Sequence, residues 1–342
     1  MKYIGLDAHS GSSFFEIQNG RGRVQRRGEV ATRERELLEL VRSVRRPRRL
    51  ICEEGVVSQW IYMLLKDEVD DLVICRPPER LGAKTDRIDA HHLANDLRQE
   101  RFVRVFHSDH EFMELRTLVS AHQDVGRALT SAKNRYRALY RQSAIATPDA
   151  PSFFKDETRV CELPTQQQRV VAESLLRQIG ALDQEKQGFE QRFAENGRRD
   201  PVVRLLMTIP GIGTTRANQL VAIIVTPDRF ATKYCFFAYA MLVKHKQTSN
   251  GRNYGTKKAK GQTLLKGLFH SAVFSVLKSD NAFCRKYHSM VGRGAGTKAA
   301  RQAVARAMAA TVLGVWKSGK PYEDGHREEL TKRACHSAVQ SL

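Results

Sequence analysis

The chain has 342 residues, of which 41% are hydrophobic, and this is enough for two or three domains with real cores. No apolar run approaches the length that crosses a membrane, and no signal peptide precedes the first predicted strand. We therefore expect a cytoplasmic protein without membrane contact. The six cysteines are scattered, which excludes a zinc knuckle and favours reduced thiols.

The net charge of +20 is concentrated in the C-terminal part of the chain. Residues 199–342 contain 24 Lys and Arg against 7 Asp and Glu, a net +17, whereas residues 1–198 contain 33 against 30. Such a basic part is typical of a protein that binds a polyanion, and a merely solvated basic surface is the alternative. Asp280 is the only acid between Arg229 and Tyr322, so a site made of several carboxylates is expected mainly in the N-terminal part.

The N-terminal part shows alternating strand and helix signals. Strands are predicted at residues 2–7, 12–18, 22–30, 48–53 and 70–75, and helices at 33–44, 57–66 and 87–98. Three strands followed by alternating helix and strand indicate an α/β domain with a mixed sheet, which we place at residues 1–108.

From Asp109 onward the strand signals stop. Helical patterns at 109–146 and 164–197, broken by prolines between them, predict a long helical hairpin over residues 109–198. Its long helices serve either interdomain packing or a dimerising coiled coil. Residues 199–342 are predicted to form a mainly helical basic domain, with helices near 214–224, 263–278 and 297–316. Within it, residues 244–263 predict a polar, Gly-rich, basic loop.

Four acids stand at the ends of predicted elements in the N-terminal part. Asp7 and Glu53 close two strands. Asp86 and Asp89 stand three residues apart at the start of a helix, so both project from one face. Four carboxylates at one sheet edge repel one another unless a cation lies among them, and such hard oxygen ligands suit Mg²⁺ or Mn²⁺. In a strongly basic protein this indicates phosphodiester chemistry on nucleic acid. Alone, Asp7 could equally be a turn residue and Asp86 a helix-dipole contact.

The basic part offers two candidate nucleic-acid contacts. A turn at residues 209–213 (Ile-Pro-Gly-Ile-Gly) precedes a helical run, and as in a helix-hairpin-helix motif Gly211 and Gly213 would present backbone N–H groups to a phosphate. A plain turn between helices is the alternative. The predicted loop adds cations that can stabilise a developing phosphorane charge, and the sequence does not rank them. These residues are Lys244, Lys246, Arg252, Lys257, Lys258 and Lys260.

Seven short motifs follow one another along nearly the whole chain. They are residues 3–7 (Tyr-Ile-Gly-Leu-Asp), 52–55 (Cys-Glu-Glu-Gly), 84–90 (Lys-Thr-Asp-Arg-Ile-Asp-Ala), 209–213, 237–240 (Phe-Ala-Tyr-Ala), 248–249 (Thr-Ser) and 317–322 (Lys-Ser-Gly-Lys-Pro-Tyr). In this order they resemble the "one-ten" family of insertion-sequence transposases. That family has a DEDD catalytic domain and a catalytic serine, and its members are described as bridge-RNA-guided recombinases.

The resemblance implies a RuvC-like, RNase H-type fold for the first domain. It also implies that Asp7, Glu53, Asp86 and Asp89 hold divalent metal, and that Ser249 is the nucleophile that becomes joined to a DNA phosphate.

Two positions depart from the family pattern. The strand end at residues 53 and 54 carries two glutamates. Glu53 is preferred as the ligand because it closes the strand and stands in the family's Glu-x-Gly form, and strand alternation directs Glu54 to the other face. Glu54 stays open as the alternative. The family usually has glycine directly after the serine, where this chain has Asn250.

The leading hypothesis is a transposase or recombinase that acts on donor and target double-stranded DNA and is associated with the nucleoid. The resemblance alone implies a structured guide RNA, and a basic surface without an obvious base-reading motif fits this. Because recombination handles two duplexes, we expect dimers or tetramers. One alternative is a RuvC-type structure-specific DNA nuclease that uses water and the four acids but not Ser249. Another is a non-catalytic nucleic-acid-binding protein, against which the intact acid set argues.

Overall fold

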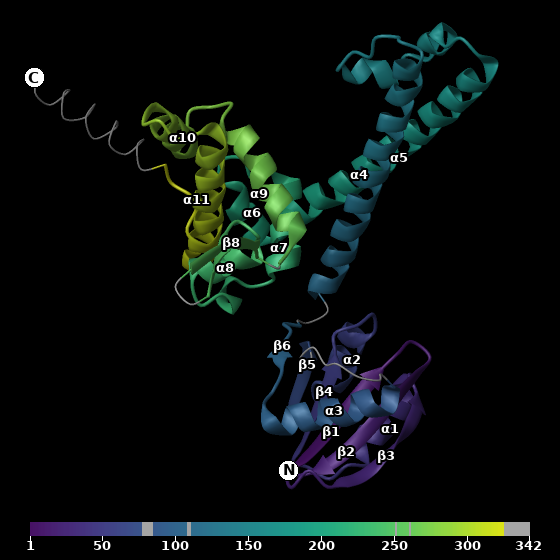
Figure 1. Ribbon diagram of the computed structural model, residues 1–342, viewed down its shortest axis with the longest axis vertical. Helices are drawn as coiled ribbons and strands as arrows, with labels where there is room; N and C mark the ends of the chain where they lie inside the picture. The colour runs from purple at the N-terminus through teal and green to yellow at the C-terminus, as the bar shows by residue number, and fades with distance from the viewer. Residues whose placement is uncertain (77–84, 108–110, 250–251, 260, 325–342) are drawn as a thin grey trace, which may run out of the picture. The chain divides into compact units, whose positions relative to one another are not determined.

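The computed structural model describes residues 1–76, 85–107, 111–249, 252–259 and 261–324 of the chain. The backbone forms two compact units, Met1–Glu111 and Phe112–Leu342 (Figure 1). The finer division of the second unit into a hairpin and a basic domain remains a prediction.

In the described part of the first unit, six strands form one mixed sheet. From edge to edge the order is β3 (Val24–Ala31), β2 (Ser12–Asn19), β1 (Lys2–Ala8), β4 (Arg48–Glu53), β5 (Asp71–Arg76) and β6 (Val103–Arg104). Strand β2 is antiparallel to both β3 and β1, strands β1, β4 and β5 are parallel, and β6 is antiparallel to β5. The predicted α/β domain with a mixed sheet is confirmed. Strand β6 was missed because two residues are too short for a periodic signal.

Helices cover both faces of this sheet (Figure 1). Helices α1 (Glu34–Arg42) and α2 (Ser58–Leu65) pack on one face, in a core that includes Leu6 and Cys52. Helix α3 (Asp86–Gln99) packs on the other face against Ile51 and Cys75. Because successive side chains of a strand point to opposite faces, the odd-numbered residues of β1 and β4 face α3. This parity decides where the acids at the strand ends point.

A close contact between β1 and α3 sets the position of that helix. A Cβ atom built on Gly5 would lie 2.2 Å from the carbonyl oxygen of Ala90 and 2.5 Å from the backbone nitrogen of Ala94. Only glycine therefore permits the helix to lie this close to the strand.

The second unit begins with two long antiparallel helices, α4 (Glu111–Gln142) and α5 (Gln166–Arg199) (Figure 1). At the far end of this hairpin, two 3₁₀ helices (Pro151–Phe154 and Glu157–Glu162) connect them. A buried cluster that includes Tyr136, Tyr140 and Phe153 fixes this end. The predicted hairpin is present, with helix ends within a few residues of those expected.

The remaining helices pack around one hydrophobic core that includes Leu206, Phe236, Phe269 and Met308. They are α6 (Pro201–Met207), α7 (Thr214–Ile224), the 3₁₀ helix Pro227–Arg229, α8 (Lys233–Tyr239), α9 (Thr263–Val276), α10 (Ala282–Gly292) and α11 (Thr297–Ser318). Among the residues that the structure describes, no helix is both long and apolar enough to cross a bilayer.

The prediction of a loop at residues 244–263 is wrong. Strands β7 (Lys244–Ser249) and β8 (Arg252–Lys258) form an antiparallel hairpin there, which we call the basic hairpin. Its strands were missed because they lack the alternation of apolar and polar residues that marks a half-buried strand. The pair Asn250-Gly251, which lies outside the described residues, is the sequence signal that could have revealed it, since Asn-Gly favours tight hairpin turns.

Candidate active site

Two of the predicted acids stand at the ends of neighbouring parallel strands. Leu6 of β1 pairs with Cys52 of β4, so Asp7 and Glu53 follow side by side on strands about 4.8 Å apart. Both are odd-numbered and lie on the face that α3 covers.

The alternative ligand Glu54 lies on the opposite face by the same alternation. Its carboxylate accepts a hydrogen bond from Nε of Arg76 on the neighbouring strand, at 2.8 Å. This ion pair gives Glu54 a partner at the end of β5. The choice of Glu53 as a ligand stays a prediction, and strand parity favours it.

Helix α3 begins at the paired aspartates because Thr85 caps it. The backbone of Thr85 is extended, and its Oγ1 accepts a hydrogen bond from the N–H of Ile88 at 3.3 Å. Asp86 and Asp89 therefore occupy the first turn, where the positive end of the helix dipole stabilises carboxylates. Lys84, which precedes the cap in the motif, lies outside the described residues.

A buried polar contact holds α3 on the sheet beside the contact at Gly5. Glu16 of β2 is fully buried, and its Oε1 lies 2.6 Å from Nδ1 of His91 on α3. The amide of Asn95, one turn further along the helix, lies 2.9 Å from Nε2 of the same ring. These contacts fix both the distance and the rotation of α3, and therefore the direction of its aspartates.

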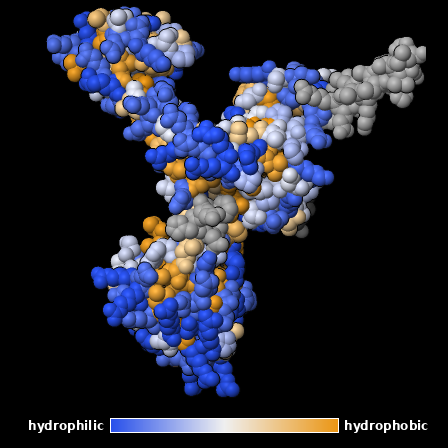
Figure 2. Space-filling view, turned by 180° about the vertical axis from the view of Figure 1, so that it is seen from behind, coloured by the Kyte–Doolittle hydropathy of each residue, from blue (hydrophilic) through white to orange (hydrophobic). Residues whose placement is uncertain are grey.

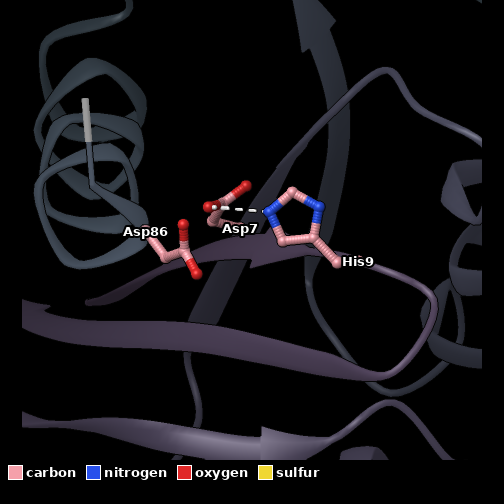
Figure 3. A group of neighbouring side chains, drawn as sticks. All are labelled: Asp7, His9 and Asp86. Atoms are coloured by element: carbon pink, nitrogen blue, oxygen red, sulfur yellow. Dashed lines mark ion pairs between the residues drawn. The ribbon is translucent and has the colours of Figure 1, made fainter.

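The structure brings Asp7 and Asp86 together with a histidine, His9 (Figure 3). One donor atom from each of these three residues lies within 4.8 Å of the other two. Asp7 is only 8% exposed. Burial raises the pKa of the Asp7 carboxyl above its usual range, and the charges of Asp86 and Asp89 act in the same direction while His9 opposes them. A buried carboxylate under repulsion from two others is an environment that a divalent cation relieves, and the donor set fits Mg²⁺ or Mn²⁺.

His9 is the residue that sequence reasoning missed. It follows β1 directly, and its backbone N–H donates to the carbonyl of Ser12 at 3.1 Å in the turn between β1 and β2. Its Nε2 lies 3.5 Å from Oδ2 of Asp7. The available signal was a potential ligand two residues after Asp7, near the end of the strand.

The predicted nucleophile lies in the second unit, on the basic hairpin. Ser249 ends β7 and pairs through its backbone with Arg252, the first residue of β8. The side chains of Lys244 and Arg252 are exposed. Lys246, Lys257 and Lys258 also lie on the two strands, and Lys260 lies outside the described residues.

Two family models match the chain. One, for the DEDD domain of IS110 elements and described as a transposase, matches residues 4–144, and the other, described as the IS116/IS110/IS902 transposase family, matches residues 203–289. The chain belongs to this transposase family. The first match includes all four predicted acids, and the second includes the basic hairpin with Ser249. The family implies an enzyme that cleaves and recombines DNA. No curated protein matches the chain.

In this transposase the turn at residues 209–213 contains two glycines with different surroundings. Gly211 is packed against a neighbouring helix, whereas Gly213 has open space around it. Gly211 has a φ of +78°, and a Cβ atom there would lie 2.6 Å from Cγ1 of Val276 on α9. Arg216 donates to the carbonyl of Gly211 at 2.8 Å, which closes the turn. Gly213, the N-cap of α7, has no atom within 4 Å of an added Cβ. Packing therefore explains Gly211, and contact of either glycine with nucleic acid stays a prediction.

Proposed function

We propose that this transposase moves its element by serine-mediated strand exchange assisted by a divalent metal. Asp7, Glu53, Asp86 and Asp89, which we call the acid site, would hold the metal. The observation that carries the proposal is the meeting of Asp7 and Asp86 at one sheet edge, inside the segment that matches the DEDD domain. An RNase H-like fold is part of the proposal, supported by an antiparallel β3-β2-β1 arrangement that continues into parallel β4 and β5.

In the proposed strand exchange, Ser249, Arg252 and the acid site each have a separate role. The hydroxyl oxygen of Ser249 loses its proton and attacks a DNA phosphorus, the bond from phosphorus to a sugar oxygen breaks as a phosphoserine ester forms, and the leaving sugar oxygen takes up a proton. A second attack by a DNA hydroxyl releases the serine and rejoins the strands, so the bond energy is conserved and no ATP is needed. We infer that Arg252 holds the phosphate, and its backbone pairing with Ser249 supports this. A divalent cation held by the acid site would supply charge neutralisation and polarise phosphate oxygens.

Ser249 and the acid site belong to different units of the chain. Their joint action requires that the units meet during the reaction, either within one subunit or between two. Dimers or tetramers that hold two duplexes satisfy this requirement.

The partners follow from charge and family. The net +17 of residues 199–342 supports binding to double-stranded DNA and association with the nucleoid. Hydrophilic residues dominate the visible face of each unit (Figure 2). A structured guide RNA is proposed from the family, and sequencing of RNA that copurifies with the native locus tests it. Random cellular RNA, together with recombination by RNA-free protein, would reject the guide.

Strand exchange between an element end and a target duplex tests the mechanism. We expect Ser249→Ala to lower the rate by at least about 10³-fold, as loss of a nucleophile does, and Asp86→Asn to do the same, while both bind DNA normally. Thr248→Val is the matched control, since it removes the neighbouring hydroxyl and should keep activity. If Ser249→Ala retains metal-dependent cleavage without strand exchange, the chain is a water-using nuclease instead.

A further inference from the structure

We propose that His9 belongs to the metal site, with its neutral Nε2 as a nitrogen ligand beside Asp7 and Asp86. As a consequence, the site prefers Mn²⁺ to Mg²⁺. This inference rests on the proposed metal dependence and goes beyond the four acids, all of which are oxygen ligands.

The spacing of the donor atoms supports a shared cation. Ligands about 2.1 Å from one octahedral ion lie about 3 Å apart when adjacent and about 4.2 Å apart when opposite. The Nε2 of His9 lies 3.5 Å from Oδ2 of Asp7, between these values, and the Asp86 carboxylate completes a group within 4.8 Å. A direct charge-assisted hydrogen bond would be about 2.7–2.9 Å long. At 3.5 Å the two groups form a long ion pair, and a small rotation of the imidazole would bring both donor atoms to the spacing of adjacent ligands on one ion.

The fold holds His9 in this place from two sides. Its backbone is fixed by the hydrogen bond to Ser12 in the β1–β2 turn, directly after the strand that carries Asp7. Asp86 approaches from the first turn of α3, and Figure 3 shows the imidazole and this carboxylate on either side of Asp7. The imidazole is 62% exposed, so it can adjust by side-chain rotation without disturbing the core.

The chemistry of the ring predicts the metal preference. Mg²⁺ takes oxygen ligands almost exclusively, whereas first-row transition ions accept imidazole nitrogen, with affinity rising along the series from Mn²⁺. A single nitrogen among carboxylates therefore favours Mn²⁺ without excluding Mg²⁺.

Electron spin echo envelope modulation of the Mn²⁺-loaded, full-length protein tests the assignment. We expect ¹⁴N modulation from a coordinated imidazole, replaced by the ¹⁵N pattern after labelling with ¹⁵N-histidine. His9→Ala should abolish it, while His288→Ala, which removes an exposed histidine of α10, should retain it. In calorimetry, His9→Ala should weaken Mn²⁺ binding about 10-fold and Mg²⁺ binding much less. His9→Asp should restore affinity without the nitrogen signal.

The outcomes separate this inference from the proposed function. Bound Mn²⁺ without nitrogen modulation, or modulation that persists in His9→Ala, would overturn the role of His9 and leave the acid site intact. Failure of Mn²⁺ and Mg²⁺ to bind at all would overturn both.

Discussion

Replacing Gly5 with alanine should move the paired aspartates away from the acid site. The added Cβ would lie 2.2 Å from the carbonyl oxygen of Ala90, where ordinary contact begins near 3.4 Å, so helix α3 must retreat by about 1.2 Å. The colliding atoms are backbone, and no rotamer change relieves them. Overpacking of this kind costs up to about 3 kcal/mol, and the smaller conformational freedom of unfolded alanine offsets less than about 1 kcal/mol of it. We therefore expect a net loss of about 2 kcal/mol in unfolding free energy.

The same displacement should weaken metal binding by about 10- to 100-fold, because Asp86 and Asp89 move with the helix. Urea unfolding followed by Trp60 fluorescence measures the stability, in a Trp316→Phe background so that only the first unit reports. Gly20→Ala is the matched control, since its Cβ meets no atom within 4 Å, and it should change stability by less than about 0.5 kcal/mol. If Gly5→Ala matches this control in stability and metal affinity, the contact does not position α3.

Three further results are expected. Because burial raises the pKa of Asp7, the ionised carboxylate destabilises the metal-free fold as pH rises, so Asp7→Asn should raise the melting temperature at pH 7 but give no gain below about pH 4. Equal gains at both values would refute this. Mg²⁺ at 100 times its Kd should stabilise the wild type by about 2.7 kcal/mol in thermal unfolding. Equal stabilisation of Asp86→Asn would show that Asp86 does not bind the metal. Arg252→Gln should reduce the slope of log affinity for DNA against log salt concentration by about 1. The control Arg35→Gln, on α1, should leave this slope unchanged. If Arg252→Gln has the same slope as the wild type, Arg252 does not contact the phosphates.

The main features of the first unit could be predicted because they are local. Hydrophobic periodicity accounts for the strands that end at Ala8, directly after Asp7, and at Glu53. The start of the helix at Asp86 also follows from a capping threonine. Asp7 and Glu53 lie on the same face of the sheet because strand side chains alternate between faces, and this can be worked out once the pairing register of β1 and β4 is known.

What could not be predicted depends on tertiary contacts or on weak local signals. The need for glycine at residue 5 is visible only once α3 packs on β1. His9 can be recognised as a candidate ligand only when the fold brings it near Asp86, which is distant in sequence. The sequence of the basic hairpin does not alternate apolar and polar residues, so periodicity gave no strand signal there and only a tight-turn pair marked it.

The residue that becomes covalently joined to DNA tests the central claim most directly. Reaction of the transposase with element-end DNA and Mg²⁺, followed by denaturation, digestion and mass spectrometry of the DNA-linked peptide, identifies it. The account predicts a phosphoserine ester at Ser249, absent from Asp86→Asn and from reactions without divalent cation. An adduct at another residue, or cleaved DNA with no adduct at any time point, would contradict the account.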